Sequence, residues 1–192
     1  MTIKKMKERL GKIILEKSFK YSENSPFTLA SGKQSNNYFN CKPTTLDPEG
    51  MNLIGAIIFD MLKNTDITAA GGLTLGADPI ANALSVISYQ KGNPIKSFIV
   101  RKDIKDHGTK SAIEGNVVPG EKIVIIDDVI TTGGSTITAI EQARKSGLKV
   151  EMVITLIDRE EGGRENILKY VDNIKSVLTR TEIMKLHAKK QA

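Results

Sequence analysis

The chain has 192 residues, of which 40% are hydrophobic and 26% carry charge. This balance excludes a disordered or collagen-like chain, and the length favours one domain over residues 1–192 rather than two independent cores. No apolar run reaches the roughly 18 residues of a membrane span, and Cys41 is the single cysteine, so we expect no transmembrane segment, secretory signal or intrachain disulfide and a cytoplasmic location. The net charge of +6 favours an anionic partner, which could be nucleic acid, a membrane or a phosphorylated small molecule.

The first 45 or so residues combine a helix with short extended pieces. Apolar residues recur at helical spacing on one face: Ile3, Met6, Leu10, Ile13 and Ile14. We favour a helix packed on that face over a helix lying on a membrane surface. The chain then breaks at 22–26 and is extended at 27–29 and again at 38–39. We therefore expect a helix-and-hairpin hood over about residues 1–45.

From residue 47 onward, strands and helices alternate. Asp47 and Pro48 form a helix start signal, with Asp as N-cap and Pro at the first helical position. The expected strands cover residues 67–70, 95–100, 122–126, 150–157 and 174–178, and further helices begin at about 78, 135, 165 and 181. Residues 101–116 read as a long polar loop. This alternation predicts an α/β core with a parallel sheet over about residues 46–180.

The strongest local motif is KIVIIDDVITTGGST at residues 122–136. An apolar strand runs into Asp127 and Asp128, a loop rich in Thr and Gly follows, and a helix starts directly after it. Unpaired N–H groups of such a loop and helix start would bind a phosphate at 131–135, while the two carboxylates could accept hydrogen bonds from sugar hydroxyls. The spacing fits neither a Walker A loop nor a dinucleotide fingerprint. The alternative is a buried strand whose two Asp only cap the next turn.

This motif resembles the signature of type I phosphoribosyltransferases, and the resemblance implies that family's parallel-sheet fold with an N-terminal hood. It further implies that the acidic pair holds the ribose hydroxyls of phosphoribosyl pyrophosphate (PRPP) and that the following loop holds its 5-phosphate. The residues that would bind PRPP in this segment are Asp127, Asp128, Val129, Ile130, Thr131, Thr132, Gly133, Gly134 and Ser135.

The segment RKDIKDHG at 101–108 is similar to the catalytic loop of orotate phosphoribosyltransferases. Taken alone, it could equally be a solvated charged loop. The resemblance implies that four of its residues reach the pyrophosphate of PRPP and that the last three of them are catalytic: Arg101, Lys102, Lys105 and His107.

Two further segments resemble the base-binding parts of the same family. In LIDREEGG at 156–163, the resemblance pairs Arg159 with the carboxylate of orotate, and Thr131 would share in base specificity. The alternative for Arg159 is a surface ion pair with Glu160 or Glu161. In FTLASGKQSNNYF at 27–39, Tyr38 and Phe39 would cover the orotate ring, although plain hairpin packing explains either of them equally well because successive strand residues face opposite ways.

Residues 71–78 match a glycine-containing loop near the pyrophosphate. The chain departs from some family members at Ala30 and Leu75, where they carry Lys, which leaves fewer fixed positive charges for the pyrophosphate.

The resemblance implies orotate phosphoribosyltransferase activity in pyrimidine biosynthesis, with orotate and PRPP as substrates and Mg²⁺ bound through substrate oxygens. It also implies a homodimer in which loop 101–116 completes the partner's site, with no nucleic-acid or membrane partner. One alternative is a phosphoribosyltransferase for uracil or a purine. Another is a nucleic-acid-binding regulator on the same fold, which the lysines near both ends would favour.

Overall fold

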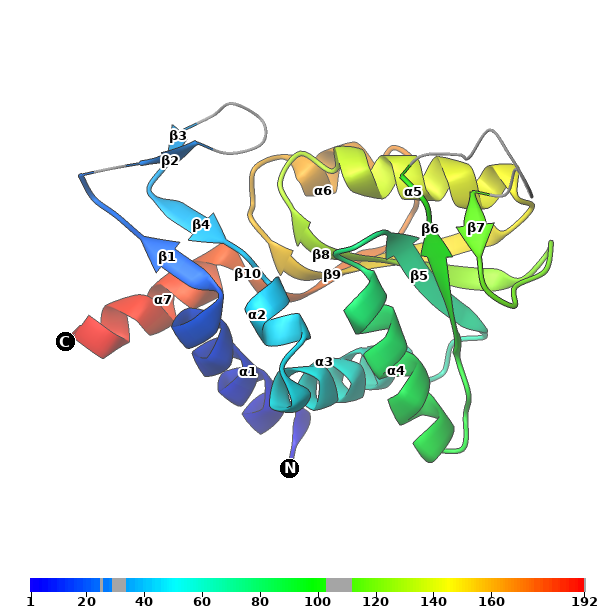
Figure 1. The fold of residues 1–192 in the computed structure, drawn as a ribbon, viewed down its shortest axis with the longest axis horizontal. Coiled ribbons are helices and arrows are strands. Elements are labelled where there is room, and N and C mark those ends of the chain that lie inside the picture. Colours follow the sequence, from blue (N-terminus) through cyan, green and yellow to red (C-terminus); the bar gives the residue numbers. More distant parts are fainter. Residues whose placement is uncertain (25, 29–33, 103–111, 192) are drawn as a thin grey trace.

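The computed structural model describes residues 1–24, 26–28, 34–102 and 112–191. Its centre is a sheet with the strand order β10-β9-β8-β5-β6-β7, in which the first five strands are parallel and β7 is an antiparallel edge (Figure 1). The strands are β5 (Ala69–Leu73), β6 (Lys96–Val100), β7 (Ile113–Glu114), β8 (Lys122–Ile130), β9 (Lys149–Asp158) and β10 (Ile174–Thr179). The predicted α/β class with a mainly parallel sheet is confirmed.

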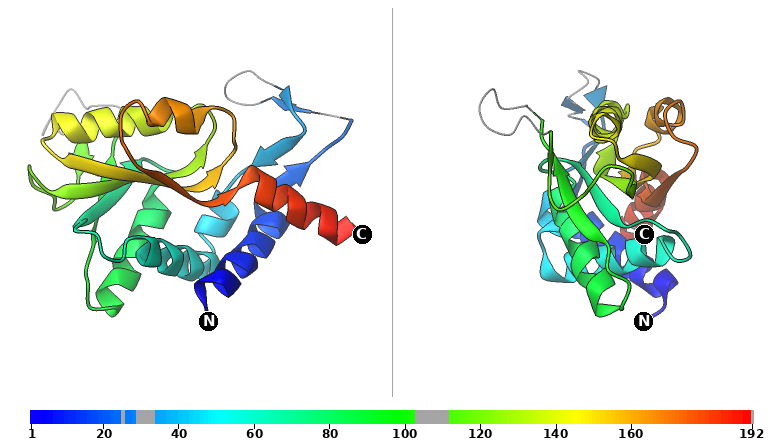
Figure 2. Two further views of the ribbon diagram at one scale, coloured as in Figure 1. Left: turned by 180° about the vertical axis from the view of Figure 1, so that it is seen from behind. Right: turned by 90° about the vertical axis from the view of Figure 1, so that its right-hand side faces the viewer.

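Helices cover both faces of the sheet (Figures 1 and 2). They are α1 (Ile3–Lys17), α3 (Pro48–Met61) and α4 (Asp78–Gln90) on one side, α5 (Gly134–Lys145) and α6 (Gly163–Ile167) on the other, and α7 (Arg180–Gln191), which packs beside α1. The apolar residues of β8 alternate between the two layers, because neighbouring strand residues face opposite ways. Val124 and Ile126 join the core under α3 and α4, whereas Ile123 and Ile125 join the core under α5. Burial on both faces explains why this strand is almost wholly apolar.

The N-terminal hood contains two small antiparallel ladders and a short helix. β1 (Phe19–Tyr21) pairs with β4 (Asn37–Phe39), and β2 (Phe27–Thr28) pairs with β3 (Gln34–Ser35). The helix α2 (Lys42–Thr45) then leads to α3. The extended pieces expected at 27–29 and 38–39 are present at 27–28 and 37–39, while residue 29 lies outside the described residues. The pairing partners of these strands were not predicted, because two or three residues carry too little pattern.

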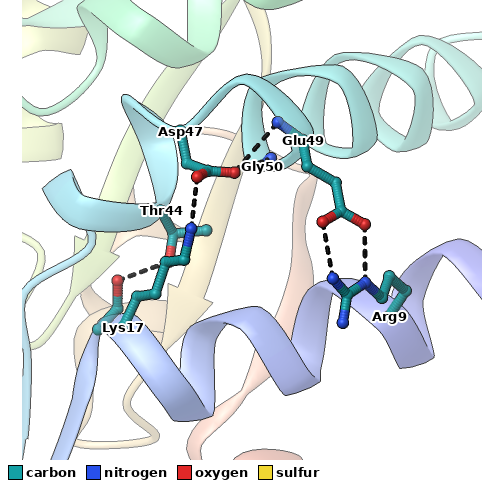
Figure 3. A network of polar contacts seen from close by, with 7 residues as sticks. Arg9, Lys17, Thr44, Asp47, Glu49 and Gly50 are labelled. Atoms are coloured by element: carbon teal, nitrogen blue, oxygen red, sulfur yellow. Dashed lines mark hydrogen bonds and ion pairs between the residues drawn. The ribbon is translucent and has the colours of Figure 1, made fainter.

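Helix α1 is tied to the start of α3 by two ion pairs (Figure 3). Arg9 makes a two-pronged contact with Glu49, with both nitrogen–oxygen distances 2.7 Å, and Lys17 pairs with Asp47. Asp47 is also the predicted N-cap, because its carboxylate accepts hydrogen bonds from the Glu49 and Gly50 amides at 3.1 and 3.0 Å. The same side chain thus starts α3 and holds α1 against it.

Four expected boundaries are wrong. The strand expected at 67–70 is β5, which covers Ala69–Leu73 because its pairing with β6 continues to Leu73↔Val100. β8 does not end at residue 126 but continues to Ile130, since its pairing with β9 persists through Ile130↔Asp158. The expected polar loop 101–116 contains the strand β7, which pairs antiparallel with β6 and includes the buried Ile113. α6 begins and ends earlier than the expected 165–170. Within the described residues, no helix combines the length and the apolar character that a membrane crossing requires.

Candidate active site

Asp127 lies inside β8 with its side chain directed at the start of α5. It is 9% exposed and accepts hydrogen bonds from the Ser135 hydroxyl at 3.0 Å and from the Thr136 hydroxyl. Burial raises the pKa of the Asp127 carboxyl to about 6, although the Thr136 hydrogen bond opposes this shift. For Asp127 the geometry therefore agrees with the alternative expectation, because its carboxylate holds the turn between β8 and the start of α5.

The Asp128 side chain lies on the opposite face of β8 from that of Asp127. Its carboxylate is half-buried and accepts a hydrogen bond from the Val129 amide at 3.0 Å. It also lies against the loop that follows β5, where a Cβ placed on Gly76 would come within 2.5 Å of an Asp128 oxygen. In that loop the Thr74 hydroxyl donates to Asp78 at 2.7 Å. The structure thus brings Asp128 against the predicted 71–78 loop, of which residues 71–73 belong to β5 and residue 78 begins α4. Leu75 is 70% exposed in this loop.

The loop between β8 and α5 is exposed at Thr132, Gly134 and Ser135. Gly133 precedes α5 with φ of 86°, and no side chain of the described residues caps this helix start. Its first N–H groups are therefore available to an anion. Of the other residues expected to bind PRPP, Ile130 is 1% exposed and Val129 packs on the core, so only their backbone can face a ligand.

Helix α6 holds this loop in place, which the sequence did not indicate. The Asn166 side-chain amide donates to the Thr132 carbonyl at 3.1 Å. A Cβ on Gly163 would lie 2.6 Å from the Thr131 carbonyl oxygen and 3.1 Å from the Gly133 nitrogen. Glycine at position 163 permits this close approach because it has no side chain.

Arg159 follows β9 and is nearly fully buried. Its backbone N–H donates to the Ile130 carbonyl at 3.0 Å, which places it beside the anion-binding loop. Its side chain is 4% exposed and its Nη2 lies 2.9 Å from Glu161 Oε1. The predicted Arg–Glu pair is thus present with Glu161, but in the interior and not on the surface.

The hood supplies the remaining contacts of Arg159. Nη2 lies 3.2 Å from the Ser35 hydroxyl and 3.3 Å from the Asn37 carbonyl oxygen, with the Asn37 side-chain oxygen at 3.4 Å. The guanidinium carbon lies 5.8 Å from the centre of the Phe39 ring. Arg159 is therefore one point at which the hood meets the core.

The two predicted aromatic residues face opposite ways. Phe39 is buried against Phe19, with ring centres 5.1 Å apart, and lies near Arg159. Tyr38 is 38% exposed, and its ring centre lies 5.7 Å from that of Phe27. Phe39 is thus a hairpin-core residue that also touches the candidate base site.

The segment expected to reach the pyrophosphate is described only at its ends. Arg101 pairs with Glu114 of β7 at 2.7 Å, and its amide donates to the Ala112 carbonyl. Lys102 is exposed. Lys105 and His107 lie outside the described residues, as does Ala30.

Three features therefore share one edge of the sheet: an acidic strand end, an uncapped helix start and a buried guanidinium. A model of the family described as phosphoribosyl transferase domain matches residues 56–185. The fold and the site together define a phosphoribosyltransferase.

Comparison with similar proteins shows which family of phosphoribosyltransferases the chain belongs to. The orotate phosphoribosyltransferase of Aquifex aeolicus is 44% identical over 178 residues, which cover 93% of this chain and 97% of that protein. The crystal structure of Mycobacterium tuberculosis orotate phosphoribosyltransferase with Fe(III) dicitrate has a TM-score of 0.79 and 32% identity, covering 93% and 98% of the two chains. Its complex with PRPP has a TM-score of 0.75 at 31% identity with the same coverage. The chain belongs to the orotate phosphoribosyltransferase family.

Proposed function

We propose that this protein transfers the phosphoribosyl group of PRPP to orotate, forming orotidine 5-monophosphate and pyrophosphate in pyrimidine biosynthesis. The observation that carries the proposal is the placement of Arg159. Its guanidinium is buried, and its backbone N–H donates to Ile130, the residue that precedes the loop between β8 and α5. A planar guanidinium suits a carboxylate, and orotate differs from uracil by that group.

Different residues would bind different parts of the two substrates. The N–H groups of 131–135 and the start of α5 would hold the 5-phosphate, and the half-buried Asp128 carboxylate would accept hydrogen bonds from the ribose. Arg159 would orient the base so that orotate N1 faces the anomeric carbon on the side opposite the leaving pyrophosphate. Arg101, Lys102, Lys105 and His107 would neutralise the charge that develops on the pyrophosphate.

Mg²⁺ is the cofactor that we propose, bound mainly through PRPP oxygens. Carboxylate oxygen is the donor type that this ion prefers, and the Asp128 carboxylate stands where the β8 and β5 loops meet. Among the described residues, no three acidic, histidine or cysteine side chains gather as a metal site. When bound, the ion would supply positive charge for the departing pyrophosphate.

The assembly and the location are also proposals. We propose a homodimer in which loop 101–116 completes the partner's site, and a cytoplasmic location. The family resemblance of the loop supports the first. The second is supported by the free, buried thiol of Cys41, because a single reduced cysteine fits a reducing compartment.

The test is the ultraviolet absorbance of orotate mixed with the protein, Mg²⁺ and PRPP, with uracil and hypoxanthine in parallel. We expect consumption of orotate only with all components, and a preference over uracil of at least about tenfold in kcat/KM, since only orotate offers Arg159 a carboxylate. Arg159→Ala should remove most of this preference while PRPP binding, measured by calorimetry, persists. If the protein binds PRPP but does not consume orotate, the assignment of orotate as the base is wrong. Turnover of hypoxanthine would then identify a purine as the base.

A further inference from the structure

The contacts that the Arg159 guanidinium makes with the described residues gather on one of its nitrogens, Nη2. The residue is 3% exposed, and the oxygens of Ser35, Asn37 and Glu161 surround its Nη2. Its Nε is buried and has no hydrogen-bond partner within the described residues. Because the Arg159 side chain is 4% exposed, a substrate carboxylate reaches the guanidinium only if a neighbouring side chain moves.

Glu161 differs from the other contacts in charge. The Ser35 hydroxyl and the two Asn37 oxygens are neutral, so Glu161 is the counter-charge among these contacts. A buried guanidinium without a counter-charge is costly, which means that something anionic must stay near Arg159 whether or not substrate is bound.

Glu161 also differs from Arg159 in its access to water. Its side chain is 20% exposed, compared with 4% for Arg159, and it lies in the short link between β9 and α6. The neighbouring Glu160 is turned away at φ of 58° and accepts hydrogen bonds from the Thr181 backbone and hydroxyl at 2.9 and 2.6 Å. Glu161 can therefore move into solvent. Arg159 is held by its contacts with the hood, and Glu160 is held by Thr181.

We propose that Glu161 is an internal stand-in for the carboxylate of the substrate. It neutralises Arg159 in the empty site and is displaced into water when the carboxylate of the base takes its place. This inference rests on the proposed function, because it assumes a base with a carboxylate. One ion pair is then exchanged for another, so the empty protein avoids a buried unpaired charge at the expense of weaker substrate binding.

The test is Glu161→Gln, which keeps the shape and the hydrogen-bond acceptor but removes the charge. We expect the KM for orotate to fall by at least about tenfold, the lower range of close charge-pair couplings at interfaces, with the KM for PRPP unchanged. The matched control is Glu165→Gln, which alters an exposed carboxylate in the first turn of α6 and should change neither KM.

A second readout does not depend on turnover. The empty Glu161→Gln protein should melt several degrees below the wild type, because Arg159 loses its counter-charge. Saturating orotidine 5-monophosphate should remove most of this difference, since its carboxylate then occupies the same place. Glu161→Asp, which keeps the charge on a shorter side chain, should fall between the two proteins in both measurements.

An unchanged or raised KM for orotate in Glu161→Gln would overturn the inference, as would a melting difference that persists with orotidine 5-monophosphate. Glu161 would then hold Arg159 in the bound state as well. A wild-type protein that neither consumes orotate nor is stabilised by orotidine 5-monophosphate would instead refute the proposed function. If Glu161→Gln does not fold, Glu161→Asp carries the same test.

Discussion

At the scale of single residues, the two adjacent aspartates of β8 have different surroundings although their chemistry is the same. Asp127 is buried and accepts hydrogen bonds from the Ser135 and Thr136 hydroxyls, while Asp128 is half-buried beside Gly76. The alternation of side chains along a strand separates them. Only Asp128 therefore keeps a carboxylate face toward the loops where substrate would lie.

The burial of Asp127 predicts a pH dependence of stability. Its pKa of about 6 in the folded protein lies above the ordinary 3.8, so the folded state binds the proton more tightly than the unfolded state. The stabilisation that this proton provides is complete below pH 4 and is lost as the pH rises through about 6. We expect the free energy of unfolding of the wild type to fall between pH 4 and 7, relative to Asp127→Asn, by on the order of 2–3 kcal/mol.

Urea unfolding of both proteins across this pH range measures the effect, with Glu141→Gln as an exposed carboxylate control. Parallel pH profiles for the wild type and Asp127→Asn would contradict the assignment of the shift to Asp127.

At the scale of elements, the anion loop depends on α6 as much as on α5. Asn166 and Gly163 contact the loop at Thr131, Thr132 and Gly133. The short helix thus acts as a support for the turn that would hold the phosphate. The Asn166 side chain donates to a backbone carbonyl of the loop from 34 positions away in the chain, which is why no local sequence pattern revealed the contact.

Gly163→Ala tests this support. Its Cβ would lie 2.4 Å from an Ile130 methyl group and 2.6 Å from the Thr131 carbonyl oxygen, so the loop must shift. We expect a loss of about 1–3 kcal/mol in the free energy of unfolding, which outweighs the gain of up to about 1 kcal/mol from helix propensity, and weaker PRPP binding by calorimetry. Gly134→Ala is the control for stability, because its Cβ would meet open space. Equal free energies of unfolding for the two variants would show that the loop shifts without cost, which would contradict the supporting role of α6.

At the scale of the whole molecule, the hood and the core meet at the candidate base site. Arg159 of the core contacts Ser35 and Asn37 of the hood, and on the opposite side Arg9 and Lys17 hold α1 to α3. Opening of the hood would therefore have to break contacts with Arg159. The division into a hood of about 1–45 and a core of about 46–180 stays a prediction, as does the single domain.

A shared site in a homodimer predicts complementation between inactive chains. Lys105→Ala removes a charge from the loop that would cross to the partner, and Arg159→Ala removes the base contact. A hybrid dimer then has one site with both changes and one with neither. Equal mixing after refolding should restore about a quarter of wild-type activity, since half the dimers are hybrid and each has one intact site. A mixture as inactive as each parent would contradict shared sites.

The sequence by itself determined the alternation of strands and helices in the core and the start of α3. The phosphate loop after β8 and Arg159 as a base contact, the latter taken from the family resemblance, stay predictions. Periodicity, capping and glycine turns act over a few residues and are therefore legible without the fold. Even the N-cap Asp47 was predictable, because its partners Glu49 and Gly50 lie within one helical turn.

Only the tertiary structure decided what surrounds those residues. Ser35 and Asn37 lie 124 and 122 positions from Arg159 in the chain, so no local pattern could pair them. The choice of Glu161 over Glu160 as partner followed from the bond of Glu160 to Thr181 of α7. Burial of Arg159 likewise depends on where the hood packs. Such contacts arise from long-range packing, which a sequence pattern of a few residues does not contain.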